Sequence, residues 1–487
     1  MKIIKLVTLL CAVAPLSTVL GDATVYPTGN PAQDVANVRG AAAGGGTVLL
    51  KAVDATGIPR AFDFGDYPVS RINWDYAGAG YVGLGTAGEI VPVSLGNFVL
   101  YVSLGNDVRL VGETVGNAMT TIKGGTIPIR NFAERQLPDG TIELVFGLAN
   151  LSVQNIRFTE SALQSVYTFQ GGSFPQVQAL VRERGLSTSI EIRNNEFLDV
   201  QPAYSRFWYA LAAVTDGPTG PVSVIDNVIH FTSGRWDAGE RAYETAQGLT
   251  QQQEFWEGFS IADLNAAGQL LDNEIEGTDT GLLVYFDGSD VVEMRDNRIE
   301  LRPNGFFGIA AEANHRYFIE RNTVIAPGPE VDGIVVWAAD PDIGINDSVI
   351  RHNRLVMDES DYGGISLVGA ASRNEVSDNK VEGTAAYALG IVNDFLGADA
   401  LAEDNLFSGN NISKFGARDS TVYGMGADVF FDTNSRNNRV NGRVKTVKDL
   451  GQNNSVPGNR VNAAGQRRMQ LTASPAKFEL VRSHPGN

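Results

Sequence analysis

The segment Leu270 to Ile275 reads LLDNEI, with an apolar residue three places before Asn273 and another two places after it. The same arrangement recurs in five further segments, which are Met294 to Ile299 (MRDNRI), Ile319 to Val324 (IERNTV), Ile350 to Leu355 (IRHNRL), Val376 to Val381 (VSDNKV) and Ala402 to Phe407 (AEDNLF). Successive asparagines are 24, 25, 31, 26 and 26 residues apart. A repeat of roughly 20 to 50 residues is typical of a solenoid, so the sequence predicts one.

Each repeat divides into three short strands by the alternation of apolar and polar residues. One strand precedes the Asn, one follows it, and a third begins at a glycine, as in Gly281 to Val284 and Gly333 to Val336. Parallel strands of successive rungs lie about 4.8 Å apart. We therefore predict a parallel β-helix with an internal asparagine ladder, in which each amide side chain bonds its neighbour and the buried turn backbone.

The N-terminal part of the chain carries a different pattern. Asp34 to Ala43 (DVANVRGAAA) has the spacing of a short helix with Asp34 as its N-cap, and Gly44 to Gly46 leads into the strand Thr47 to Leu50. A further rung follows at Val108 to Glu113. This order resembles the pectate-lyase-like superfamily of right-handed parallel β-helices, from about residue 34 to about residue 460. The resemblance implies an all-β fold with a short capping helix, and it specifies no activity because many chemistries occur on this scaffold.

Composition agrees with one large β-rich domain, since the chain has 487 residues, 54 of them Gly, and only 19% are charged. Met1 to Lys5, an apolar run to Leu20 and then Gly21 are typical of a cleavable signal peptide. A membrane anchor would need about 20 apolar residues, and Pro15 interrupts this run. We expect a signal peptide at 1–21, a β-helix domain at 22–460 and a basic tail at 461–487, in a secreted or periplasmic protein.

The predicted mature chain is strongly acidic. Removing Lys2 and Lys5 with the leader leaves 36 basic against 56 acidic residues, a net charge of −20. This charge disfavours nucleic acid and anionic membrane surfaces as partners. It would also repel polyuronates unless a bound cation or a local basic patch intervened. Cys11, the single Cys of the chain, leaves with the leader, so no Cys metal ligand is expected.

The longest insertion between repeats runs from Thr232 to Glu257 and contains Arg235, Trp236 and Trp256. Extra length in a solenoid forms loops on one face, often the binding face. These three residues are therefore candidates for substrate contact in a lid or subsite wall. The alternative, given equal weight, is a surface loop whose aromatic side chains pack on the side of the β-helix.

The outer face of the glycine-led strands is unusually apolar. If the first and third residues after each glycine point inward, then the fourth residue after each glycine points outward. These fourth residues are Ala262, Tyr285, Glu312, Trp337, Val368, Asp394 and Phe430. An apolar face of this kind usually marks an interface or a groove. A loop or the tail would cover it, identical chains would pack there in a homo-oligomer, or a polysaccharide or oligosaccharide would lie along it.

Tyr285, Glu312 and Trp337 fall on consecutive rungs, so Glu312 would have an aromatic side chain about 5 Å away on each side. Aromatic rings stack on sugar rings, and apolar surroundings would raise the pKa of the Glu312 carboxyl toward that of a general acid. His315 and Arg316 follow in the same turn. They would act as base and charge clamp, or simply face solvent.

Asp394 and Asp428 form a second candidate pair of carboxylates. A separation of one rung and two residues gives about 8 Å, within the range of about 6.5 to 9.5 Å that inverting glycosidases use. The chain lacks the Asn-Thr-Asp, Asp-Asp and Gly-His-Gly sequences of polygalacturonase-type β-helices. No catalytic residue is therefore carried over from that resemblance.

A lyase would need a cation beside the uronate carboxylate, and the outer face of the glycine-led strands carries no Lys or Arg. Calcium is the one cofactor that the sequence would admit, and no compact calcium loop appears. Its oxygen ligands would be residues such as Asp287, Asp290, Asp340 and Asp342.

Two functional hypotheses follow from the sequence. The first is a secreted protein that cleaves, as a hydrolase or a lyase, or otherwise processes a polysaccharide along the outer face of the glycine-led strands. The second is a non-catalytic surface, adhesion or assembly protein that uses the same apolar face as a protein interface. A face buried in an oligomer or under the protein's own chain would be closed to a glycan.

Overall fold

The computed structural model confirms a parallel β-helix with an N-terminal capping helix. It describes residues 22–42, 45–64, 100–101, 108–123, 129–130, 132–136, 142–146, 151–159, 167–169, 189–198, 207–216, 221–231, 255–262, 267–285, 291–303, 305–312, 316–338, 344–393 and 400–456. The predicted leader at 1–21 and tail at 461–487 lie outside these residues. The described chain forms two compact units, one up to Pro221 and one from Val222 onward.

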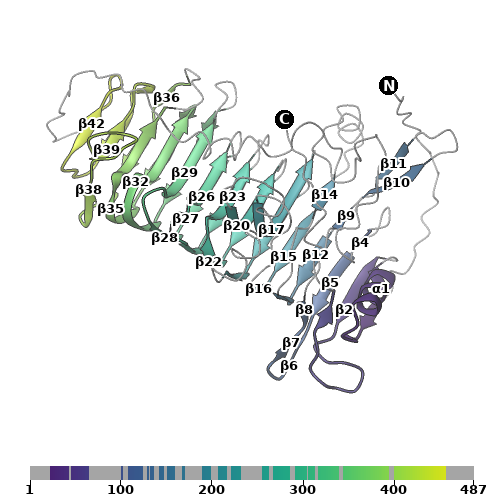
Figure 1. Cartoon of the computed structure of the whole chain (residues 1–487). Helices are drawn as coiled ribbons and strands as arrows, with labels where there is room; N and C mark the ends of the chain where they lie inside the picture. Colours follow the sequence, from purple (N-terminus) through teal and green to yellow (C-terminus); the bar gives the residue numbers. More distant parts are fainter. Residues whose placement is uncertain are drawn as a thin grey trace, which may run out of the picture. The chain divides into compact units, whose positions relative to one another are not determined.

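Unit 1 begins with β1 (Ala23–Val25) and α1 (Pro31–Ala42) and contains short rungs of parallel strands (Figure 1). One parallel sheet is formed by β1 (Ala23–Val25), β2 (Gly46–Leu50), β5 (Val108–Gly112), β12 (Leu151–Gln154) and β15 (Ile190–Arg193). A second series is formed by β3 (Phe62–Asp63), β8 (Thr121–Lys123), β13 (Arg157–Thr159) and β16 (Glu196–Leu198).

The remaining strands of unit 1 form separate pairs. The parallel pairs are β14 (Tyr167–Phe169) with β17 (Phe207–Asp216), and β4 (Leu100–Tyr101) with β9 (Ile129–Arg130). The antiparallel pairs are β10 (Phe132–Gln136) with β11 (Ile142–Phe146), and β6 (Thr114–Val115) with β7 (Ala118–Met119).

The capping helix is confirmed, but its predicted N-cap is wrong. The helix begins at Pro31, and Oδ1 of Asn30 accepts a hydrogen bond from the Gln33 amide at 3.1 Å, so Asn30 is the N-cap. Asp34 lies one turn later and is fully buried. Its carboxylate accepts hydrogen bonds from the amides of Gly29 and Asp63, and it thereby joins the start of the helix to β3.

Unit 2 has three parallel sheets, which correspond to the three predicted strands of each rung (Figure 1). Sheet 1 precedes the asparagines and consists of β18 (Val222–Ile225), β21 (Gly268–Leu271), β24 (Val291–Arg295), β27 (Arg316–Glu320), β31 (Val349–Arg351), β34 (Glu375–Ser377), β37 (Leu406–Ser408) and β41 (Arg439–Asn441). Its inward residues, such as Met294 and Ile319, are fully buried.

Sheet 2 follows the asparagines, and sheet 3 contains the glycine-led strands. Sheet 2 consists of β19 (Val228–His230), β22 (Glu274–Thr278), β25 (Arg298–Leu301), β28 (Thr323–Pro327), the first parts of β32 (Arg354–Gly369) and β35 (Lys380–Val392), and β38 (Phe415–Ala417). Sheet 3 consists of β20 (Phe255–Ala262), β23 (Thr280–Tyr285), β26 (Phe307–Glu312), β29 (Asp332–Ala338), the second parts of β32 and β35, β39 (Ala427–Phe431) and β42 (Val447–Asp449).

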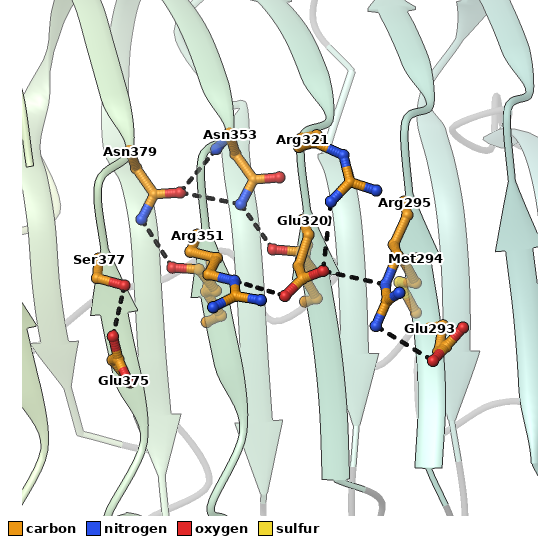
Figure 2. Close-up of polar contacts among 12 residues, drawn as sticks. Glu293, Met294, Arg295, Glu320, Arg321, Arg351, Asn353, Glu375, Ser377 and Asn379 are labelled. Carbon is orange, nitrogen blue, oxygen red and sulfur yellow. Dashed lines mark hydrogen bonds and ion pairs between the residues drawn. The ribbon is translucent and has the colours of Figure 1, made fainter.

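The asparagine ladder is present and internal. Nδ2 of Asn353 donates to Oδ1 of Asn379 at 2.9 Å and to the carbonyl oxygen of Ile319 at 2.8 Å (Figure 2). In unit 2 the same contacts link Asn227, Asn273, Asn297, Asn322, Asn353, Asn379 and Asn410. The residue before each Asn has a positive φ, which places the Asn at a tight corner between sheets 1 and 2.

One asparagine that the sequence pattern assigned to this ladder belongs elsewhere. Asn405 forms a second ladder with Asn374, Asn438 and Asn454, at corners before sheet 1. These corners are flanked by the short strands β30 (Ile345–Asn346), β33 (Ala371–Ser372), β36 (Ala402–Glu403) and β40 (Ser435–Arg436). In unit 1, Asn155 has the positive φ, and Ile156 takes the ladder position next to it.

The ladder predicts a large stability difference between two asparagines. Asn353→Ala removes the partners of the buried amide of Asn322 and of the Ile319 carbonyl, which should cost about 2 to 5 kcal/mol of unfolding free energy in urea denaturation. The control is Asn437→Gly, at an exposed corner residue whose positive φ glycine retains. It should change the unfolding free energy by less than about 0.5 kcal/mol. Equal losses in the two variants would contradict a structural role for the amide ladder.

Candidate binding site

The register of sheet 3 confirms part of the predicted alignment. Glu312 pairs with Trp337 on the next strand. Val284 pairs with Ala311, and Tyr285 and Glu312 are the residues that directly follow this pair. Glu312 is half-buried and Trp337 is 4% exposed. The hydroxyl of Tyr317 donates to the carbonyl oxygen of Glu312 at 2.6 Å, and burial raises the pKa of Tyr317 well above its usual value.

The alignment predicted for the last two rungs is wrong. Val368 pairs with Val392, and the pairs on both sides of Ala388 place Asp428 beside it. Asp428 therefore aligns with Ala388, which is six residues before Asp394 in the sequence. The prediction had aligned it with a residue two before Asp394. The reason is that Gly390 does not begin a strand. It lies under the ring of Tyr387, whose Cε2 would be 2.4 Å from a Cβ at that position.

Asp428 is 3% exposed and is held by the segment that leads into β42 on the next rung. Its carboxylate Oδ2 accepts hydrogen bonds from the amides of Lys445 and Thr446, at 2.5 and 3.1 Å. The amide of Asp428 donates to Oγ1 of Thr446 at 2.9 Å. These bonds fix the carboxylate against the start of β42.

Only some of the other predicted site residues lie among the described residues. Asp394, His315, Arg235 and Trp236 lie outside the described residues, as do the four aspartates suggested as calcium ligands. Trp256 lies on β20 and Tyr285 on β23. Arg316 is exposed at the start of β27 in sheet 1, so it lies on a different sheet from Glu312.

Most of the outer face of sheet 3 is buried where its side chains are described. Glu312 is half-buried, and seven other outward residues are each less than one tenth exposed, namely Leu283, Ala310, Val335, Trp337, Ser366, Val368 and Phe430. Part of the cover is a tyrosine cluster, formed by Tyr362, Tyr387 and Tyr423 with Phe430. The ring centroid of Tyr387 lies 5.2 Å from the ring centroid of Tyr423 and 5.6 Å from that of Phe430. This face is therefore closed by the protein's own side chains over β32, β35 and β39.

The segment that carries Tyr423 is fastened to β32, two rungs earlier. Oγ of Ser420 donates to the carbonyl oxygen of Asp361 at 2.7 Å, and Oγ1 of Thr421 donates to its carboxylate at 2.9 Å. Beneath it, Oδ1 of Asp332 accepts the amide of Gly363 at 3.0 Å, and the hydroxyls of Ser366 and Tyr387 lie 3.0 Å apart. This network satisfies polar groups that the aromatic cover removes from water.

Gly363→Ala should disrupt the tyrosine cluster, because a Cβ there would lie 2.1 Å from Cε2 of Tyr387 and 2.7 Å from Oγ of Ser366. We expect a loss of at least about 2 kcal/mol and altered near-ultraviolet circular dichroism. Gly416→Ala is the matched control, since a Cβ at that position meets no atom closer than 3.9 Å. A Gly363→Ala protein with wild-type stability and spectrum would show that the cluster tolerates displacement.

The tyrosine cluster also predicts a response to alkaline pH. Burial raises the pKa of Tyr387 and Tyr423 well above the usual value, so their neutral forms are favoured in the folded protein. Their stabilising effect is complete below about pH 10, the pKa in the unfolded chain, and declines as the pH rises toward the folded value. Both tyrosines should stay un-ionised above pH 10 until a cooperative unfolding step. Early, gradual titration of all 14 tyrosines, followed by tyrosinate absorbance, would contradict this.

Sheet 1 presents a charged outer face that the sequence interpretation missed. Arg295, Glu320 and Arg351 occupy paired positions on β24, β27 and β31. Glu320 is 1% exposed and is surrounded by guanidinium groups (Figure 2). Its Oε1 lies 2.6 Å from Nε of Arg351, and its Oε2 lies 3.1 Å from Nε of Arg295 and 3.5 Å from Nη1 of Arg321. A buried carboxylate requires such partners, because an unpaired one would be very costly.

An aromatic ring completes this arginine cluster, which we define as Arg295, Arg316, Arg321 and Arg351. Phe318 lies on β27, and the guanidinium carbons of Arg295 and Arg316 are 5.7 and 5.3 Å from its ring centroid. Cation–π contacts of this length help to hold the two side chains in place. Comparing the outward residues of the repeats rung by rung would have revealed the alternating Arg, Glu and Arg.

Comparison with known proteins gives two kinds of similarity. A family model described as "Periplasmic copper-binding protein (NosD)" matches residues 247–455, which is less than half of the chain. Two solved structures of PfbA, a surface protein and adhesin of Streptococcus pneumoniae, are similar at TM-scores of 0.38 and 0.36. They are 11% and 10% identical, covering 86% and 89% of this chain and 98% and 93% of theirs. No curated protein matches the chain.

Copper does not fit the part of the chain that the structure describes. There, no group of three or more His, Cys, Asp or Glu side chains is placed to hold a metal ion. The chain has four His, and its single Cys lies in the predicted leader. Copper prefers imidazole, thiolate and thioether ligands, so these residues give no basis for a copper site. Among the described residues, no helix is long and apolar enough to cross a membrane.

Proposed function

We propose that this protein is a non-catalytic, extracytoplasmic β-helix that binds a polysaccharide on the exposed outer face of sheet 1 and its flanking corners. The predicted signal peptide at 1–21 supports export, and the predicted domain at 22–460 would be the secreted body. The periplasmic and surface proteins to which the chain is similar are consistent with this location. The non-catalytic role comes from the second of the two hypotheses from the sequence and the polysaccharide partner from the first, and the proposed surface differs from the sheet 3 face that both had used.

The observation that carries this proposal is the burial of the outer face of sheet 3. A cleavage site would need that face open to a polymer, yet Trp337 and Val368 are 4% and 3% exposed. Asp428, half of the proposed carboxylate pair, is bound by the amides of Lys445 and Thr446, directly before β42. The same burial argues against sheet 3 as a protein interface, because its apolar side chains are already covered.

The exposed face of sheet 1 and its flanking corners support a binding role instead. They carry ion pairs that cross from rung to rung, such as Arg321 with Asp296 and Arg373 with Asp347. Such pairs contribute little to stability individually, since exposed ion pairs are worth at most about 1 kcal/mol. They do give a long, regular, polar surface on a rigid scaffold, which suits an extended polymer.

Binding without cleavage is the expected result of a polysaccharide screen. The secreted protein is incubated with neutral and acidic polysaccharides, with and without calcium, and we measure retention, new reducing ends and the ultraviolet absorbance of unsaturated uronate ends. Retention with neither product supports the proposal. Reducing ends alone would indicate a hydrolase, and both products together would indicate a lyase. Either result would overturn a non-catalytic role.

Hydrolysis with Glu312 as general acid remains the second candidate, favoured by one observation. Glu312 is half-buried next to Trp337 on the adjacent strand, an environment that suits a carboxyl acid beside a sugar ring. If the screen detects reducing ends, Glu312→Gln should reduce that activity at least about 100-fold. A folded Glu312→Gln protein with full activity would exclude this role.

A further inference from the structure

The arginine cluster on sheet 1 is held in place before any ligand arrives. Glu320 positions Arg295 and Arg351 from rungs on either side, and Phe318 positions Arg295 and Arg316. Arg321 is held by both carboxylate oxygens of Asp296, at 2.8 and 2.6 Å. Guanidinium groups fixed in this way lose little conformational freedom when they bind a further anion.

The cluster has more positive than negative charge. Its four arginines meet three carboxylates, those of Glu293, Asp296 and Glu320, which leaves a local charge of +1 in a chain whose net charge is −18. Arg316 provides the surplus, since none of the described carboxylates lies within ion-pair distance of it. It is also exposed, so its donors are accessible from solvent.

The border of the cluster is acidic. Asp226 and Asp272 are exposed at the corner positions of the two rungs before Asp296. Burial, followed by the charges of Asp296 and Asp226, raises the pKa of Asp272. The hydrogen bond from Arg373 lowers the pKa of Asp347, and the charges of Arg373 and Arg316 lower it further. A polymer with a carboxylate on every sugar would meet repulsion on both sides of the cluster.

We propose that the arginine cluster binds a single carboxylate of an acidic sugar that is flanked by neutral sugars in a polysaccharide chain. This inference rests on the proposed polysaccharide-binding function and names its ligand class. Arg316 donates to the carboxylate, Arg295, which packs on the same Phe318 ring, supports it, and Glu320 acts as a positioning residue for Arg295. Neutral sugars on either side lie over the polar face of sheet 1, where they avoid the acidic border.

The test compares three soluble probes by isothermal titration of the secreted full-length protein. The probes are xylan with sparse glucuronic acid branches, unsubstituted xylan and polygalacturonate. We expect the sparsely branched xylan to bind most tightly, and Arg316→Ala to weaken its binding about tenfold with little change for unsubstituted xylan. The control is Arg298→Ala, which removes the same charge from an exposed side chain on sheet 2 and should leave all three affinities within about twofold.

Each other outcome has a defined meaning. Equal weakening by Arg316→Ala and Arg298→Ala would overturn the site, because the effect would then be one of net charge. Tighter binding of polygalacturonate than of the branched xylan would overturn the preference for an isolated carboxylate. Binding of both xylans with equal affinity would leave the proposed function intact and reject the arginine cluster as its acidic-sugar site. Absence of binding to all three probes and to a wider neutral panel would reject the proposed function itself.

Discussion

The hydrogen bonds of the stacked asparagine amides are the constraint on which this β-helix depends. A solenoid turns its backbone at every corner, and each turn leaves amide and carbonyl groups that no sheet partner can reach. In unit 2 an Asn on each rung satisfies those groups of its neighbours, as Asn353 does for Asn322 and Ile319. The chain must then keep its rungs in register, and every outward side chain acquires a fixed neighbour on the next strand. The two ladders therefore position the surface as well as the core.

That fixed register has opposite consequences on different sheets. On sheet 3 it stacks apolar side chains into a face that the tyrosine cluster covers, with Tyr387 lying over Gly363 and Gly390. On sheet 1 it stacks Arg295, Glu320 and Arg351, so a buried carboxylate can hold arginines from both adjacent rungs. A covered aromatic face favours stability, whereas an exposed, preorganised cationic face favours binding. Function is therefore better sought on the polar sheet.

The fold could be predicted from the sequence because the Asn corners and the glycine-led strands repeat with a nearly constant length. The failures occurred where that repeat was misleading. Asn405 has the same local pattern as Asn379, but it lies at a different corner, and only long-range pairing distinguishes the two. Gly390 resembled a strand start, although it is glycine because a tyrosine ring lies above it. Local patterns identify corner types and do not reveal which side chains cover a face.

The arginine cluster escaped sequence interpretation because exposed charged residues usually face solvent. Its members are distinguished only by stacking, which requires the register. The most direct measurement of the central claim is modification of arginines by phenylglyoxal, followed by mass spectrometry, with and without the sparsely branched xylan. Saturating xylan should protect Arg316 from modification and leave Arg298 as reactive as before. Protection of Arg298 with unchanged modification of Arg316, under conditions where the xylan is bound, would place the ligand elsewhere and contradict the account.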